Sequence, residues 1–178
     1  DDKWAAFWSA GIMWDLKKEN FLADIEPVTT LQFSYNSGTS GNSSIGNYEH
    51  LYLMAAGPEY GGDIGVGASI LGNPALTWEK ILSHNISLNV GIWNRINFTA
   101  EWYKKKTRDM LMSVPVSMVS GFAYRRQNVG KMENSGFEFD FNADILKIND
   151  FTWNFATNFA YNKNEITELY NGQDEYVI

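Results

Sequence analysis

The sequence of 178 residues contains 21 Asp and Glu against 14 Lys and Arg, and its net charge of −7 argues against a nucleic-acid partner, which needs a basic surface. Cysteine is absent, so disulfides and thiolate metal sites are excluded. The two imidazoles, His50 and His84, lie far apart in the sequence, and we therefore expect no metal and no cofactor.

The first quarter of the chain predicts two strands separated by a short helical connection. Residues 3–15 alternate two sets of side chains, with tryptophans on one set, as a strand does. In residues 16–25, apolar side chains recur among charged ones, which predicts one or two helical turns, and Pro27 closes this connection. Residues 30–36 return to strict alternation and predict the second strand.

Two long polar stretches interrupt this pattern. Residues 37–73 are rich in Gly, Ser and Asn, and residues 106–131 hold several Lys and Arg, so we expect both to be long loops of the kind that carries function. Between them, residues 77–91 and 96–103 alternate again and predict two strands joined by a tight turn near Trp93. The order of short links and long loops is typical of an up-and-down barrel whose two ends differ.

Residues 137–145 and 153–162 predict a hairpin around a turn at 147–150. One set of alternate positions is apolar and rich in aromatic rings, while Glu, Asp and Asn dominate the interleaved set. Each run is long enough to cross a bilayer as a tilted barrel strand, which takes roughly 9–11 residues. The aromatic share of 15% with a mean hydropathy of −0.30 suits such a wall, because half its positions face lipid and half face water. No stretch approaches the roughly 18 consecutive apolar residues of a membrane helix.

The predicted fold class is therefore all-β: an antiparallel up-and-down meander of about six long strands, part of the wall of a transmembrane β-barrel. Polar side chains would face the lumen and rings would face lipid. The prediction fails if the rings of the hairpin pack inward against a second layer. Two alternatives remain: a soluble β-sandwich that binds glycan through loop aromatics, and a glycan-degrading enzyme with Glu138 and Asp140 as its carboxylate pair. For that pair, a hydrated lumen wall is the simpler interpretation.

The two predicted loops hold the candidates for contact with substrate or a partner protein, with ordinary loop packing as the alternative. They are Tyr48, His50, Tyr52, Tyr60, Phe122, Tyr124, Arg125 and Arg126. A second group of aromatic residues lies near the ends of the apolar runs, where a girdle at the membrane interface is a simpler interpretation than sugar-stacking platforms. They are Trp4, Trp14, Trp78, Trp102, Trp153 and Tyr161. No catalytic residue is predicted.

Several motifs in the second half of the chain resemble one family. The ten residues from Leu71 read LGNPALTWEK and resemble the LGNPxLxWEK segment of SusC/RagA-type TonB-dependent outer-membrane receptors of the Bacteroidetes. One such motif would be weak, but further similar segments follow in the family's order. They cover residues 94–97, 103–111, 120–122, 127–138 and 151–164, with looser counterparts at 14–22 and 41–42. The strand at residues 31–36 lacks the basic start that is typical of the family.

The resemblance implies a large barrel of about 22 strands with an N-terminal plug. It further implies import of oligosaccharides, or in some members peptides, driven through the TonB complex, with a SusD-like surface lipoprotein as the partner. The location implied is the cell outer membrane, with outer-membrane lipid around the barrel. Residues 1–178 would then be a partial barrel domain from the C-terminal portion, without plug or TonB box, and the loops at about 37–73 and 106–131 would be of the extracellular type. The start of the chain shows no signal peptide, so we expect an excised piece that transports nothing by itself.

Overall fold

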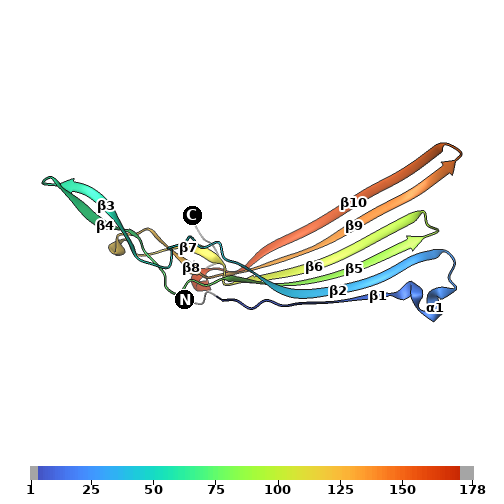
Figure 1. The fold of residues 1–178 in the computed structure, drawn as a ribbon, viewed down its shortest axis with the longest axis horizontal. Helices are drawn as coiled ribbons and strands as arrows, with labels where there is room; N and C mark the ends of the chain where they lie inside the picture. Colours follow the sequence, from blue (N-terminus) through green and yellow to red (C-terminus); the bar gives the residue numbers. More distant parts are fainter. Residues whose placement is uncertain (1–3, 173–178) are drawn as a thin grey trace.

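Six strands build one antiparallel sheet in this computed structural model, which describes residues 4–172. The order is β1-β2-β5-β6-β9-β10, so each strand of the sheet pairs with the next one along the chain (Figure 1). The strands are β1 (Ser9–Asp15), β2 (Val28–Asn42), β5 (Glu79–Ile92), β6 (Ile96–Arg108), β9 (Lys131–Ile148) and β10 (Phe151–Glu168). β1 and β10 are the open edges of the sheet. The predicted antiparallel meander of six strands is confirmed.

The predicted strand at residues 3–15 is shorter in the structure. β1 begins at Ser9, residues 4–8 have no regular strand, and Lys3 lies outside the described residues. The first residues alternate as a strand does, but a strand also needs a neighbour. β1 pairs with β2 only from Ser9 onward, opposite Gly38.

The connections at one end of the sheet are short, as predicted (Figure 1). Between β1 and β2, the 3-10 helix η1 (Leu16–Lys18) and the helix α1 (Asn20–Ala23) form the expected helical turns. The ammonium of Lys17 holds this connection together by donating to three backbone carbonyls. They are the oxygens of Leu22, Ala23 and Ile25, at 3.0, 2.9 and 2.9 Å.

The two tight turns at this end depend on residues with positive φ. Trp93 and Asn94 have φ of 54° and 52° in the predicted turn between β5 and β6. The Trp93 amide donates to the carbonyl of Pro27 at 2.8 Å, which ties this turn to the neighbouring connection. Between β9 and β10 only Asn149 (φ 49°) and Asp150 stand outside the strands, so the turn is tighter than the predicted 147–150.

A β-bulge in β9 changes the face that its last residues occupy. Trp153 pairs with Leu146 while Asn154 pairs with Asp144, so Ile145 is an extra residue in the ladder. The sequence pattern places Ile145 on the apolar set that contains Ala143. In the structure, Leu146 takes that place, because one inserted residue shifts the two-residue period by one position.

The long connections lie at the other end of the sheet and contain more strand than expected. β2 continues to Asn42, so residues 37–42 of the predicted loop at 37–73 belong to the sheet. The rest of that stretch holds a separate hairpin of β3 (Leu53–Tyr60) and β4 (Asp63–Ile70), which projects beyond the sheet (Figure 1). The extended part of β2 is polar on both faces, so side-chain alternation does not mark it, whereas backbone pairing with β5 does.

The stretch predicted as a loop at residues 106–131 is also structured. β6 continues to Arg108, and a second small hairpin of β7 (Leu111–Pro115) and β8 (Tyr124–Asn128) follows. The 3-10 helix η2 (Met118–Ser120) lies between these strands, and η3 (Tyr170–Gly172) follows β10.

The sheet is a single layer whose two faces are both open along residues 4–172. The buried hydrophobic side chains in that range are Leu76, Val114 and Ala143. The rings of Phe159 and Tyr161 on β10 are 61% and 58% exposed. The rings therefore do not pack against a second layer, and the β-sandwich alternative is excluded. In the same range, no helix is long and apolar enough to cross a membrane.

Candidate functional site

The register of the sheet sorts its side chains into one apolar and one polar face. Residues that pair across neighbouring antiparallel strands share a face. Trp102 pairs with Ile86 on one side and with Phe137 on the other, and Phe137 pairs with Tyr161. One row of large apolar side chains thus crosses four strands. The next two rows toward the turns are also mainly apolar, with Ala100 and Thr157 as their small members. Within this face the rings of Phe98 and Phe139 pack edge to face, with their ring centroids 4.4 Å apart.

The apolar face has the height that a bilayer requires. On β10 it extends from Phe151 to Tyr161, ten residue steps, which is about 33 Å along the strand. A strand tilted by about 40° would then cover about 25 Å, the height of the apolar band of an outer-membrane barrel.

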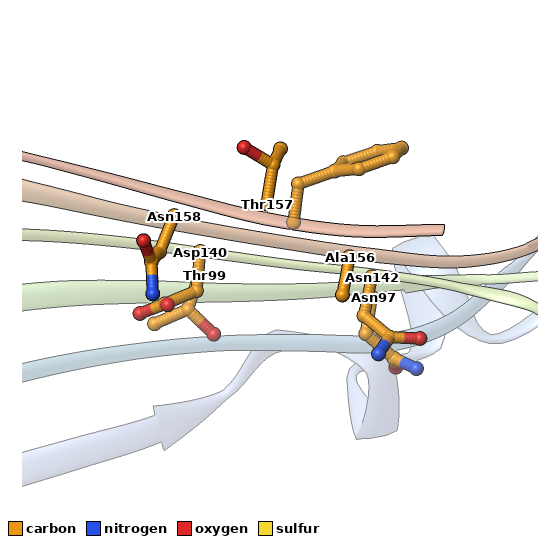
Figure 2. A pocket seen from close by; sticks show the side chains of 8 residues that line it. Asn97, Thr99, Asp140, Asn142, Ala156, Thr157 and Asn158 are labelled. Atoms are coloured by element: carbon orange, nitrogen blue, oxygen red, sulfur yellow. The ribbon is translucent and has the colours of Figure 1, made fainter. Parts of the chain in front are cut away.

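The polar face carries a shallow hollow over β6, β9 and β10 (Figure 2). Its volume is about 550 Å³. Two cross-strand rows form its floor, one of Thr99, Asp140 and Asn158 and one of Asn97, Asn142 and Ala156. Ala156 is the small member of its row. Figure 2 shows Thr157 pointing away from these side chains, toward the opposite face.

Amide, hydroxyl and carboxylate groups make the hollow a surface of both donors and acceptors. The Thr99 hydroxyl donates to Asn89 Oδ1 at 2.8 Å. Asn154 Nδ2 donates to Asn142 Oδ1 at 3.1 Å and to Asp144 Oδ1 at 2.8 Å. Such groups exchange hydrogen bonds with a hydrated polar solute without a large desolvation cost.

The two long connections meet at a second candidate site. A cavity of about 260 Å³ lies between them. It is lined by Glu49, Ser69, Ile70, Leu71, Ser113, Phe122, Tyr124, Arg125 and Arg126. The structure thus brings together the four second-loop residues that we predicted for binding and places them against the first loop.

Both arginines of this cavity hold the first connection in place. Arg126 Nη2 donates to the carbonyl of Ser44 at 3.3 Å, and its Nε lies 3.6 Å from Glu49 Oε2 in an ion pair. Arg125 Nη2 donates to Asn73 Oδ1 at 3.1 Å. These contacts agree with loop packing, which was the alternative for these residues. A role in binding stays a prediction.

Three of the first-loop candidates, Tyr48, His50 and Tyr52, do not line this cavity. The side chains of Tyr48 and Tyr52 are 62% and 63% exposed, and that of His50 is half-buried. The backbone of Tyr60 ends β3, opposite Asp63 in the projecting hairpin. The cavity therefore brings together the four second-loop candidates without Tyr48, His50 and Tyr52.

Asn73 is the central residue of the contact between the two connections, and we did not predict it as a site residue. Its side chain is 7% exposed. Asn73 Nδ2 donates to the carbonyl of Arg126 at 2.8 Å, and its Oδ1 also accepts from the Ala75 amide at 3.2 Å. Before it, Gly72 lies so close to Leu51 that a Cβ would sit 2.2 Å from the Leu51 carbonyl carbon. The signal was available, because both residues belong to the segment LGNPALTWEK.

Asn128 and Glu79 join the same two connections nearer the sheet. Asn128 Nδ2 donates to the Thr77 carbonyl at 2.7 Å, and its Oδ1 accepts from the Thr77 amide at 2.8 Å. Glu79 accepts from the Leu111 amide and from Asn42 Nδ2, both at 2.8 Å. Both residues also stand in segments that carry the resemblance. We define the loop clamp as Asn73, Glu79 and Asn128.

Four of the six residues predicted for an aromatic girdle lie on the apolar face of the sheet. They are Trp14, Trp102, Trp153 and Tyr161. The other two, Trp4 and Trp78, lie outside the strands, and Trp4 is 94% exposed. Trp78 packs against Phe7 with ring centroids 6.0 Å apart. A girdle at the membrane interface stays a prediction for all six.

Comparison with known proteins shows the family. Residues 1–177 match the family described as TonB dependent receptor-like, beta-barrel. TonB-dependent receptor P3 of Formosa agariphila is 35% identical over 181 residues, covering 99% of this chain and 18% of that protein. TonB-dependent receptor SusC of Bacteroides thetaiotaomicron is 36% identical over 183 residues, covering 98% of this chain and 18% of that protein.

A solved structure of the RagAB peptide transporter has the same fold in this region. It matches with a TM-score of 0.89 and 35% identity, over 97% of this chain and 19% of that chain. The chain therefore spans less than a fifth of the length of the relatives that it matches.

Proposed function

Because this chain belongs to the TonB-dependent receptor β-barrel family, we propose that the receptor of which it is a part imports oligosaccharides or peptides. The chain itself is a stretch of the wall of an outer-membrane barrel. The observation that carries the proposal is the polar face of the sheet with its hollow of about 550 Å³. In a barrel whose apolar face contacts lipid, this polar face lines the lumen.

The chemistry of the polar face favours neutral or cationic solutes that are rich in hydrogen-bonding groups. Oligosaccharides and peptides both present many donors and acceptors. The carboxylates on this face outnumber its cations, which disfavours anionic solutes. On β6, β9 and β10 they are Glu101, Glu138, Asp140 and Asp144, against Lys105 and Lys147. For Glu138 and Asp140 this is a role in the lumen wall and not in catalysis.

The projecting loops are the proposed contact surface for a SusD-like surface lipoprotein. The β3–β4 hairpin exposes Met54, Ile64 and Val66, which are large apolar side chains at a loop end. Tyr48 and Tyr52 add exposed rings beside it. A lid protein that covers the barrel would bury this surface, as partners bury exposed apolar patches.

The orientation and the energy source follow from the same proposal. The end with long connections faces the outside of the cell, and the end with α1 and the tight turns faces the periplasm. Energy for import would come from the TonB complex, through a plug and a TonB box that have no counterpart in this stretch of barrel wall.

A pair of substitutions at neighbouring residues of β10 tests the lumen assignment. In the full-length receptor, Ala156→Trp fills the hollow and is expected to lower uptake of a labelled oligosaccharide or peptide several-fold. Thr157→Trp places the same ring on the opposite face and should leave uptake unchanged. Immunoblots of outer membranes check that both variants assemble. Equal uptake by the two variants at equal receptor levels would contradict the proposal, and comparing the two labelled solutes identifies the substrate class.

A further inference from the structure

We call the part of the apolar face that extends from Phe151 to Tyr161 on β10, with the residues paired to it, the apolar band. A group of cations lies on the same face, immediately beyond this band. The last full row of that band contains Trp102 on β6 and Tyr161 on β10. Two residues further toward the loop end, the same face carries Lys104, paired across the strands with His84 and Ser135. The face thus changes from rings to cations within a single step of about 7 Å.

The cations continue over three successive rows of this face. β6 contributes every second residue, Lys104, Lys106 and Arg108, and Arg108 pairs across the strands with Lys80 and Lys131. Neighbouring strands are about 4.8 Å apart, so these groups lie within reach of a single ligand. We define the cationic patch as Lys80, Lys104, Lys106, Arg108, Lys131 and Lys163. It holds six of the 14 Lys and Arg of a chain whose net charge is −7.

Acidic residues neutralise the patch only in part. Glu133 accepts from Lys104 at 2.7 Å and from Lys106 at 3.0 Å, so one carboxylate serves two ammonium groups. The other acids paired with the patch are Asp109 with Lys80, Glu168 with Lys131 and Glu165 with Lys163. Arg108 takes part in none of the ion pairs among the described residues. Among the described residues, six cations against four acids leave an excess of two positive charges at this place.

We propose that the cationic patch binds the phosphate of a membrane lipid whose acyl chains lie along the rings below it. Apolar chains and an anionic headgroup, joined in one molecule, match the two parts of this surface in the order in which they occur. A bundle of basic side chains beside the membrane attracts anionic headgroups with about 1 kcal/mol per charge. The ligand class is therefore a phosphate-bearing lipid of the leaflet at the loop end of the barrel.

Lys105 supplies a matched control within the same strand. It points to the polar face, where its ammonium lies 5.4 Å from the centre of the Tyr103 ring. Replacing it removes one positive charge at the same height without touching the cationic patch. If lipid binding depended only on net charge, this variant would also bind less lipid. If lipid binds to the cationic patch, this variant should bind lipid as the wild type does.

Native mass spectrometry of the full-length receptor in detergent tests the proposal with phosphatidic acid as the probe and phosphatidylcholine as the neutral comparison. The wild-type receptor should retain more phosphatidic acid than phosphatidylcholine. Lys104→Gln combined with Lys106→Gln and Arg108→Gln should weaken that binding at least about tenfold, and Lys105→Gln should leave it unchanged.

Three results would overturn the proposal. One is equal retention of both lipids, and another is equal loss in the triple variant and in Lys105→Gln. The third is displacement of the lipid by glycerol 3-phosphate at similar concentration, because the site would then bind a free phosphate ester. If the triple variant fails to assemble, Arg108→Gln alone should weaken binding about fivefold, and an unchanged affinity would refute the site. Import of a solute is not measured, so the test is independent of the proposed function.

Discussion

Replacing Asn73 with alanine tests whether the loop clamp holds the two long connections together. The substitution removes the bond to the Arg126 carbonyl at 2.8 Å and the bonds from Arg125 at 3.1 Å and Ala75 at 3.2 Å. Because Asn73 is only 7% exposed, water does not readily replace these partners. Two of these bonds reach the second connection, a neutral one worth roughly 1 kcal/mol and one from a charged group worth roughly 1.5–3 kcal/mol. Because Arg125 is only half-buried and can bond to water in the variant, we take the lower part of their sum and expect a local loss of about 2–3 kcal/mol.

Hydrogen exchange of the full-length receptor measures this loss where it arises. If β8 opens locally, 2–3 kcal/mol corresponds to an exchange rate roughly 30 to 150 times higher in residues 124–128. The strands of the sheet should keep their protection. Asn158→Ala, in the polar hollow, is the control and should leave β8 unchanged. An Asn73→Ala variant whose β8 amides exchange less than about threefold faster would refute the reasoning, because the backbone contacts would then suffice.

Three further substitutions probe the faces and the connections. Phe139→Arg places a charge on the apolar face and should cost about 2–4 kcal/mol of stability in the membrane. The amount of folded receptor, measured by gel shift, should fall in this variant and stay unchanged in Asp140→Arg, whose side chain is on the polar face. Equal losses of folded receptor in the two variants would contradict the assignment of faces. Gly72→Ala forces a Cβ against Leu51 and should speed proteolysis within residues 43–52, so an unchanged digest would argue against a close contact. Lys17→Met removes three hydrogen bonds to backbone carbonyls and should raise the rate of hydrogen exchange in residues 20–28. An unchanged exchange rate would show that these bonds do not stabilise the connection.

The strands within the apolar band could be predicted from the sequence because their signal is local. Residues 137–145 and 153–162 alternate so regularly that a strand with one apolar face is the only regular structure that fits them. The absence of a second layer was implied by the number of rings on that face. The bulge at Ile145 was not predictable, since a single inserted residue leaves no mark in an apolar run.

The strand ends beyond the apolar band could not be predicted from side-chain alternation. Residues 37–42 and 104–108 are polar on both faces, because they lie beyond the part of the sheet that carries the rings, and the two-residue period disappears. Their strand structure comes from backbone hydrogen bonds to neighbouring strands, which any side chain permits.

By itself, the sequence determined the class of fold, the two unlike faces and the position of the connections, because periodicity along a strand records which side contacts water. Only the tertiary structure decided which distant residues meet. Asn73 reaches Arg126 across 53 positions, and the cationic patch assembles from four strands whose register aligns them. These contacts depend on which strands pair and in which register. The two-residue period of a strand does not specify its partner strand.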